Sequence, residues 1–420
     1  MRKPVAFIAL LLFFAVPAAA LALPAASPEE VGLSSERLAR IESALSRQIE
    51  AKSFPGAVAV VARKGRVAYF VTVGQLDPKS SAPMSKDAIF RLYSMTKPFT
   101  SVAALMLVEE GRLRLNDPIG MYLPQLAKLD VVVRTNDATG KPTYAAVASD
   151  RPVTVYDLLR HTSGFVYGGF TPNAHMKELY TKANVQWAGV TPKEQIEAFS
   201  KVPLAHQPGT AWEYSFSTDL VGRVVEAITG GSLGAFLDER LFRPLQMKDT
   251  AFVVPADKLK RIAQPLASDR TSANPITLHD VSVAPKNDAG GAGAAGTAAD
   301  YVRFLQMMAN GGQLDGQRLL SRTTVRQMTS DHLGDIKPVH SILPAGYGFG
   351  LGFAVRRADG LNGAPGSGGE YTWGGAGGTS FWVDPKEQVV AVLMTQARPG
   401  PWQREFRELF RQLVYQSIVD

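Results

Sequence analysis

The sequence predicts an α+β protein in which an antiparallel sheet, built from both chain ends and flanked by helices, is interrupted by a mainly helical insert. Strand patterns occur within residues 57–73 and again within residues 348–395. The clear patterns between them are helices and loops. Because strands from both ends can pair around an insertion, this order favours a single sheet. We expect an α/β domain of residues 23–111 and 286–420, and an inserted domain of residues 112–285.

Residues 1–22 have the pattern of a secretory signal peptide. Two positive residues, Arg2 and Lys3, precede a short apolar run. A small-residue cleavage signal, Ala20-Leu21-Ala22, follows it. The apolar run is shorter than the roughly 20 residues of a membrane span, which favours cleavage over an uncleaved anchor. We therefore expect an exported protein, periplasmic or secreted, without a stable membrane span.

The composition excludes several classes of function. The chain has no cysteine, which rules out disulfides, thiolate metal sites and a cysteine nucleophile. Its six histidines show no metal-ligand spacing, so we expect neither a metal nor another cofactor. The formal net charge of +7 comes from interspersed charges without a basic run, so no nucleic-acid partner is expected. A small-molecule substrate is the expected partner, and no pattern indicates the oligomeric state.

The first elements after the signal peptide are a helix and a hairpin. A helix start at Ser34-Ser35-Glu36 precedes apolar residues at helical spacing, namely Leu38, Ile41, Leu45 and Ile49. Two strand patterns, Ala57–Val61 and Val67–Val73, flank a turn at Lys64-Gly65 and predict the hairpin.

The remaining elements are predicted by the same rules. Helices are expected over residues 153–160, 192–200, 218–229, 233–242, 297–310 and 403–419, and strands over 348–355, 371–384 and 388–395. Loops are expected over residues 131–150 and 163–190. The run Gly291–Gly296 matches G-x-G-x-x-G, but a loop precedes it where a dinucleotide site needs a strand. We therefore interpret these glycines as a flexible approach to the next helix.

A buried helix carries the first pair of chemistry-bearing residues. Residues 95–110 are apolar on nearly every face, which is typical of a buried helix. Pro98 is tolerated only in a first turn, so this helix must begin close to Ser94. Ser94 and Lys97 then share one face. A serine hydroxyl needs a base before it becomes a nucleophile, and burial disfavours the charged form of a lysine. The alternative is an N-cap serine beside a surface lysine.

Two later motifs are candidates to complete a site. Tyr214-Ser215 lies in a loop that leads into a helix, where the tyrosine is either the second half of a base or a packing residue. Trp373–Gly378 lies in a strand pattern, where glycines mark either close approach of a ligand or backbone, or a loose β-turn or bulge. Strand N–H groups at such a place can bind an oxyanion. Three aromatic residues are candidates either for an acyl pocket or for the core: Tyr167, Phe170 and Trp212.

In this order, the three motifs resemble those of the serine β-lactamase and penicillin-binding-protein superfamily. In detail the chain is similar to the family VIII carboxylesterases, which are close in sequence to class C β-lactamases. The resemblance covers roughly residues 28–415. Three further segments contribute to it: Leu158–Gly164, Pro208-Gly209 and Gly296–Asp300. The resemblance implies a β-lactamase-like fold.

The resemblance also implies a role for each matched residue. Ser94 attacks the acyl carbonyl, and Lys97 and Tyr214 act together as general base and then as general acid. The backbone N–H groups of Ser94 and Ala376 form the oxyanion hole. The side chains and glycines expected to contact the substrate are Trp373, Gly374, Gly375, Phe216, Tyr167 and Trp212.

Two departures from the lactamase pattern favour neutral esters. The middle motif of class C lactamases is Y-x-N, whereas here it is Tyr214-Ser215-Phe216, so the amide is missing. The third motif has Trp373 where lactamases carry the lysine of K-T-G, so the cation that pairs with a carboxylate is missing. Both changes make the expected pocket more apolar.

The sequence therefore predicts a serine carboxylesterase that hydrolyses short-chain or moderately bulky esters through an acyl-enzyme on Ser94. A β-lactamase or D-Ala-D-Ala peptidase is the first alternative, because it shares this chemistry and the exported location. A non-catalytic binding or sensor protein on the same fold is the second, although the intact Ser94, Lys97 and Tyr214 argue against it. Acyl transfer to an alcohol or amine also stays open, because it uses the same acyl-enzyme.

Overall fold

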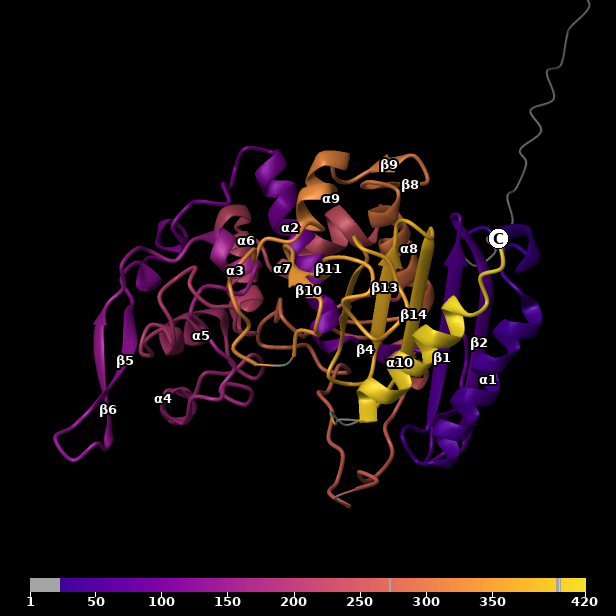
Figure 1. The fold of residues 1–420 in the computed structure, drawn as a ribbon, viewed down its shortest axis with the longest axis horizontal. Helices are drawn as coiled ribbons and strands as arrows, with labels where there is room; N and C mark the ends of the chain where they lie inside the picture. Colours follow the sequence, from indigo (N-terminus) through magenta and orange to yellow (C-terminus); the bar gives the residue numbers. More distant parts are fainter. Residues whose placement is uncertain (1–22, 272, 341, 398–399, 401) are drawn as a thin grey trace, which may run out of the picture.

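The computed structural model describes residues 23–271, 273–340, 342–397, 400 and 402–420. The predicted signal peptide, residues 1–22, lies outside the described residues. An eight-stranded antiparallel sheet forms the centre of the fold, with the strand order β10-β11-β12-β13-β14-β1-β2-β3 (Figure 1). Its strands are β1 Gly56–Arg63, β2 Arg66–Asp77, β3 Ala82–Pro83, β10 Tyr347–Phe349, β11 Ala354–Arg356, β12 Tyr371–Gly374, β13 Ser380–Asp384 and β14 Val389–Thr395.

The sheet joins the two ends of the chain, because β1 pairs with β14 from Ala57↔Thr395 to Arg63↔Val389. This pairing confirms the predicted sheet architecture. The predicted hairpin is also confirmed, as β1 and β2 pair on either side of Lys64-Gly65. The boundaries of the two predicted domains stay a prediction.

Helices cover both faces of the sheet. The helices α1 Ser35–Glu50 and α10 Trp402–Tyr415 pack together on one face, where Ala57, Ala59 and Val61 of β1 point toward them. On the other face lies α8 Ala298–Ala309, on the side of Val58 and Val60. Successive residues of a strand point to opposite faces, so β1 contributes to both cores.

The helix α2 Lys97–Glu109 is buried on all sides from Lys97 to Leu107, as predicted. A 3₁₀ turn, Tyr93–Thr96, precedes it, and Pro98 occupies its first turn. The ring of Phe99 packs edge-on against Phe304 of α8 at a centroid distance of 4.7 Å. The chain is buried at Leu92, half-buried at Ser94 and buried again from Met95 onward, so Ser94 lies at the boundary of the core.

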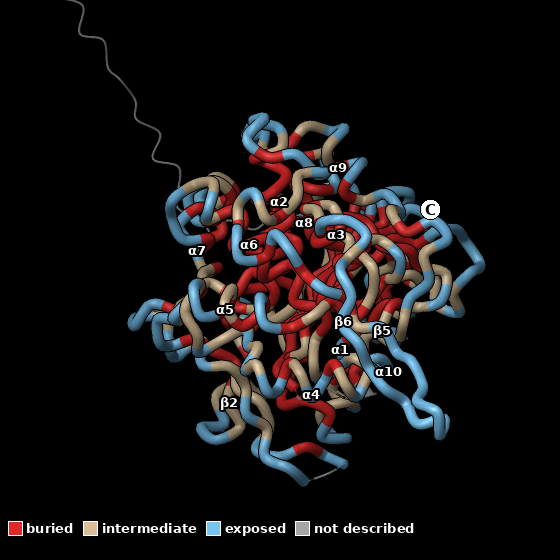
Figure 2. The backbone as a smooth tube through the Cα atoms, turned by 90° about the vertical axis from the view of Figure 1, so that its left-hand side faces the viewer, coloured by how far each residue is buried: buried red, intermediate tan, exposed pale blue. Residues whose placement is uncertain are grey.

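The region between the two groups of strands is mainly helical, but part of it differs from the prediction. Residues 131–150, expected as a loop, contain the hairpin β5 Asp130–Asn136 and β6 Pro142–Ala148, which projects from the body and is largely exposed (Figures 1 and 2). Residues 163–190 contain α4 Ala174–Lys182, whose first N–H groups bond to the side chain of Asn173. The hairpin is largely exposed and shows no clear apolar face, whereas α4 buries Met176 and Tyr180 at helical spacing, a signal that the loop prediction overlooked.

Two predicted strands are each divided in the structure. Residues 348–355 form the short hairpin β10–β11, and residues 371–384 form β12 and β13 joined by a glycine turn. The remaining elements are α3 Val155–Leu159, α5 Pro192–Phe199, α6 Ser217–Thr229, α7 Leu233–Leu237, α9 Arg322–Met328, β4 Phe90–Arg91, β7 Ala295–Gly296, β8 Gln313–Leu314 and β9 Gln317–Arg318. Among the described residues no single helix has the length and apolar composition of a membrane span; one pair, Ser217–Thr229 with Leu233–Phe242, reaches both only across an 81° bend.

Candidate active site

Ser94 and Lys97 lie where the 3₁₀ turn passes into α2, and their side chains meet. The Nζ of Lys97 lies 3.2 Å from the Oγ of Ser94. The lysine is fully buried, and its Nζ also contacts the Tyr167 hydroxyl at 3.2 Å and the Gly291 carbonyl oxygen at 2.7 Å. These three acceptors match the three N–H donors of an ammonium group. One of the three is the predicted nucleophile.

Asp219 of α6 connects to Lys97 through two bridges. Its Oδ2 accepts the Tyr167 hydroxyl at 3.4 Å, and its Oδ1 accepts the Gly291 N–H at 3.1 Å. Burial raises the pKa of the Asp219 carboxyl, whereas the charge of Lys97 opposes that increase. Burial, and then Asp219, raise the pKa of Tyr167 well above its ordinary value. Tyr167 therefore keeps its proton, accepting a hydrogen bond from Lys97 and donating one to Asp219.

Tyr214 presents its ring, rather than its hydroxyl, to the lysine. The Nζ of Lys97 lies 4.7 Å from the centroid of this ring, within the range of a cation–π contact. The Tyr214 hydroxyl accepts the indole N–H of Trp373 at 3.3 Å. The second and third motifs are thus joined directly, and the hydroxyl that contacts Lys97 belongs to Tyr167.

A buried chain of hydroxyl groups lies behind Tyr214. Nδ1 of His161 lies 3.1 Å from Oγ of Ser215, which lies 2.7 Å from Oγ of Ser217. Burial, and then the charge of Lys97, lower the pKa of His161 well below its ordinary value, so the imidazole stays neutral. His161 follows the end of α3, and these contacts give it a structural role there.

The third motif forms the turn between β12 and β13. A Cβ on Gly375 would lie 2.2 Å from the carbonyl oxygen of Leu92, and a Cβ on Gly377 would lie 2.9 Å from the Tyr93 ring. Only glycines allow this turn to pack on the residues that precede Ser94. Ala376 lies between the two glycines, and among the described residues its N–H has no backbone acceptor.

An aromatic cavity of about 390 Å³ adjoins this cluster. Pockets for small organic ligands are commonly about 300–1,000 Å³ and mostly apolar. The aromatic side chains that line it are Tyr167, Phe170, Tyr180, Trp187 and Phe216. Trp212, expected in the pocket, is instead fully buried in the core, where it packs against Phe349 and Tyr214.

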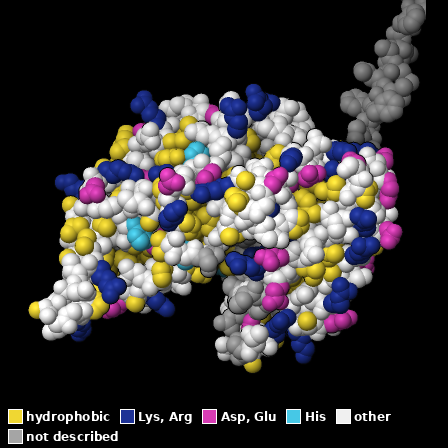
Figure 3. All heavy atoms as spheres, in the orientation of Figure 1, with side chains coloured by type: hydrophobic (Ala, Val, Ile, Leu, Met, Phe, Trp, Pro, Cys, Tyr) yellow, Lys and Arg dark blue, Asp and Glu magenta, His cyan; other side chains and the backbone are white. Residues whose placement is uncertain are grey.

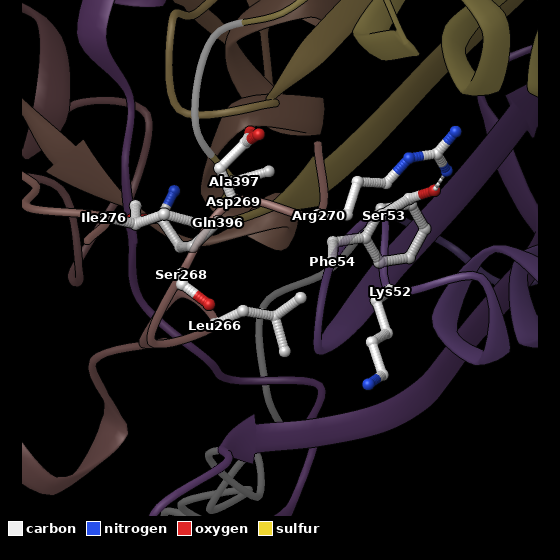
Figure 4. Close-up of a pocket in the computed structure, with 10 residues that line it drawn as sticks. All are labelled: Lys52, Ser53, Phe54, Leu266, Ser268, Asp269, Arg270, Ile276, Gln396 and Ala397. Atoms are coloured by element: carbon white, nitrogen blue, oxygen red, sulfur yellow. Dashed lines mark hydrogen bonds between the residues drawn. The ribbon is translucent and has the colours of Figure 1, made fainter. Parts of the chain in front are cut away.

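A second hollow lies outside this cluster. The hollow in Figure 4 is lined by residues that include Phe54 and Ala397. Two other lining residues, Arg270 and Ser53, are joined by a hydrogen bond of 2.8 Å. The hollow does not admit a water-sized molecule. The described residues contain no group of three His, Asp or Glu side chains that could hold a metal ion. Positive and negative side chains are interspersed on the face in Figure 3.

The sequence did not predict two polar groups of the cluster, the carboxylate of Asp219 and the backbone carbonyl of Gly291. Asp219 follows Ser217 and Thr218 in the first turn of α6, where acidic residues are common, so the sequence carries no distinct signal for its burial. The segment at Gly291 leads into α8, as predicted, but it is packed in the core and is not the flexible segment that was expected. Its residues are mostly buried, and the carbonyl oxygens of Gly290 and Gly291 accept hydrogen bonds from Thr100 and Lys97.

Comparison with known proteins gives matches over most of the chain. Residues 41–416 match the family model described as Beta-lactamase. The chain is 35% identical over 372 residues to protein Rv1367c of Mycobacterium tuberculosis, covering 85% of this chain and 90% of that protein. It is 30% identical over 379 residues to Esterase EstB of Burkholderia gladioli, with the same coverage of 85% and 90%. Among solved structures, EstCE1, described as a hydrolase with promiscuous acyltransferase activity, has a TM-score of 0.72 at 25% identity, covering 90% of this chain and 99% of that one.

Proposed function

The chain belongs to the beta-lactamase family, and on that premise we propose that it is a serine carboxylesterase. The proposed substrates are neutral esters of short or moderately bulky carboxylic acids. The observation that carries the proposal is the contact of 3.2 Å between Lys97 Nζ and Ser94 Oγ, next to an aromatic cavity. The relative named Esterase EstB supports ester hydrolysis on this fold.

In the proposed acylation step, Ser94 Oγ attacks the ester carbonyl carbon while its proton passes to Lys97. Tyr214, whose hydroxyl bonds to Trp373 in the structure, is the proposed second half of the base and carries the proton on to the leaving alcohol. This step starts from the neutral amine of Lys97, formed when the ammonium has released one proton to solvent. The lysine nitrogen then turns its lone pair toward Ser94, and its two N–H groups stay on Tyr167 and Gly291. Negative charge develops on the carbonyl oxygen, where the N–H groups of Ser94 and Ala376 stabilise it. The C–O bond to the alcohol then breaks, and the alcohol leaves with the proton.

Deacylation repeats these events with water in place of the serine hydroxyl. The same base takes a proton from water, whose oxygen attacks the acyl carbon of the Ser94 ester. The acid leaves, and the proton returns to Ser94. An alcohol that replaces water would give acyl transfer, and the description of EstCE1 supports testing this reaction as well.

The surroundings of the cluster favour neutral acyl groups over anionic β-lactams. Phe216 lines the cavity, and its side chain offers no amide to a lactam. Trp373 is buried and directs its indole N–H to Tyr214, so it cannot pair with a substrate carboxylate. We therefore expect at most weak hydrolysis of β-lactams.

The test is hydrolysis of p-nitrophenyl butyrate by the wild type and by Ser94→Ala. Loss of the nucleophile should lower kcat/KM by at least about 1,000-fold. Ser101→Ala is the matched control, because Ser101 is a buried serine of the adjoining helix α2 whose hydroxyl has no hydrogen-bond partner among the described residues. Retained activity in Ser94→Ala would overturn the proposal. Nitrocefin turnover by the wild type at a rate comparable to the ester would favour the β-lactamase alternative.

A further inference from the structure

Arg407 of α10 places a cation against the backbone of the third motif. Its Nη2 donates to the carbonyl oxygen of Gly375 at 2.6 Å and to that of Thr379 at 2.9 Å. Two other arginines of the same helix pair with carboxylates, Arg404 with Glu408 and Arg411 with Glu370. In the described part of the chain Arg407 forms no such ion pair. Its charge is therefore directed to peptide groups.

The glycine that precedes these carbonyls admits the guanidinium. A Cβ on Gly374 would lie 3.1 Å from the Cζ of Arg407. The Nε of Arg407 is enclosed and has no hydrogen-bond partner among the described residues. Burial lowers the pKa of Arg407 to about 10, which leaves the group protonated at neutral pH. A partly buried cation is thus kept at this turn although no carboxylate compensates it.

The Gly375 carbonyl and the Ala376 N–H belong to one peptide group. None of the described peptide bonds is cis, and in a planar trans peptide the C=O and N–H point in opposite directions. A cation that holds the carbonyl on the α10 side therefore turns the N–H away from α10. Hydrogen bonds in a chain polarise one another, so a cation on the oxygen makes the N–H a stronger donor. The next carbonyl, of Ala376, accepts the side-chain N–H of Gln403 at 2.9 Å.

We propose that Arg407 is a positioning residue of the oxyanion hole, which orients and polarises the Gly375–Ala376 peptide. The inference rests on the proposed function, because it requires that the Ala376 N–H receives the oxyanion formed on Ser94. The effect of Arg407 grows with the negative charge on the substrate oxygen. Arg407 therefore stabilises the transition state more than the bound ester.

The test compares Arg407→Met and Arg407→Lys with the wild type. Removal of an oxyanion donor costs about 100- to 1,000-fold in kcat, and here the donor stays but is weakened, so we expect a loss of about tenfold for Arg407→Met. The KM for p-nitrophenyl butyrate should stay within about twofold, because ground-state binding is unchanged. The affinity for butaneboronic acid, which forms a tetrahedral anion on a serine, should fall by the same factor as kcat. Arg407→Lys keeps the charge and should recover part of both losses.

Arg411→Met is the control for loss of a buried cation from α10. It leaves the buried Glu370 without its closest cationic partner, so Tm should fall while kcat per fluorophosphonate-titrated site stays at the wild-type value. If either Met variant does not fold, Arg407→Gln and Arg404→Gln replace the pair.

A variant Arg407→Met with a lower Tm but wild-type kcat and boronate affinity would overturn the inference, because its role would then be structural only. If the wild type itself neither hydrolyses the ester nor binds the boronate, the proposed function fails first, and the inference fails with it. The two failures are therefore distinguishable.

Discussion

The hydroxyl of Tyr167 lies 3.2 Å from Nζ of Lys97, the same distance that separates this nitrogen from Oγ of Ser94. The hydroxyl also donates to Asp219, and the ring lines the aromatic cavity. One side chain therefore connects the proposed base, a buried carboxylate and the proposed substrate space.

Loss of the Tyr167 hydroxyl should slow the reaction. In Tyr167→Phe a buried N–H of Lys97 loses its acceptor, which costs about 1–3 kcal/mol, so kcat should fall by roughly tenfold. Tyr214→Phe should lose more, about 100-fold or above, because a proton carrier is removed. Tyr180→Phe is the control, since Tyr180 lines the same cavity and bonds to the Val166 N–H. Steady-state kinetics measure kcat of the three variants and show which loss is larger. A wild-type kcat in Tyr167→Phe would contradict the role of the Tyr167 hydroxyl as a partner of Lys97.

Loss of the indole N–H of Trp373 should have a smaller effect. Trp373→Phe keeps the aromatic contact with Tyr214 but removes the donor to its hydroxyl. A neutral hydrogen bond contributes about 1 kcal/mol, so kcat should fall by roughly fivefold. Trp382→Phe is the matched control, because the indole N–H of Trp382 is buried without a partner among the described residues. Equal kcat values in the two variants would show that the donor is not used.

The exposed ring of Phe170 at the cavity should contribute to the binding of esters with long acyl chains and not of those with short ones. Phe170 lines the cavity with 51% of its surface exposed, so Phe170→Ala should change stability little. The KM for p-nitrophenyl octanoate should rise by about fivefold, because apolar contact area is lost, whereas the KM for the acetate should stay constant. Leu361→Ala, at an exposed apolar residue away from the cavity, is the control. An unchanged octanoate KM would place the acyl group elsewhere.

Ionisation of the buried Asp300 carboxyl in α8 should make the protein less stable as the pH rises. Burial raises the pKa of Asp300 to about 6, against the opposing effect of hydrogen bonds from the Asp249 N–H and the Thr250 hydroxyl. Between pH 4 and 6 the unfolded chain therefore releases a proton that the folded chain keeps, and the free energy of unfolding falls with rising pH, by at most about 3 kcal/mol.

Urea unfolding at pH 4 and pH 7 tests this relationship. In Asp300→Asn the decrease between the two pH values should shrink by the contribution of Asp300, whereas Asp335→Asn, at an exposed aspartate, should behave as the wild type. An identical decrease in Asp300→Asn and the wild type would exclude the titration of this carboxyl as its cause.

The sheet and the nucleophile segment were predictable because their signals are local. The apolar run after Ser94 and the position of Pro98 define a buried helix without any tertiary knowledge. The apolar strand patterns on either side of Lys64-Gly65 and the strands near the end of the chain similarly favour one sheet. The turn that divides residues 348–355 was not predicted, although Gly350 and Gly352 lie in it, because apolar residues typical of a strand stand on both sides of these glycines.

The partners of Lys97 were not predictable in the same way. A backbone carbonyl such as that of Gly291 is present at every residue and carries no signal in the sequence. Tyr167 and Tyr214 are chemically identical, and only tertiary packing decides which presents its hydroxyl to the lysine and which presents its ring. Asp219 and Arg407 reach the cluster from separate helices, α6 and α10, so their roles depend on how the chain folds.

The most direct test of the central claim is labelling by a biotinylated fluorophosphonate, followed by mass spectrometry of the labelled peptide. We expect the label on Ser94 in the wild type, and labelling at least about 100-fold slower in Lys97→Met, because the base is lost. Label on a residue other than Ser94, or equal labelling rates in the wild type and Lys97→Met, would contradict the claim that Lys97 activates Ser94.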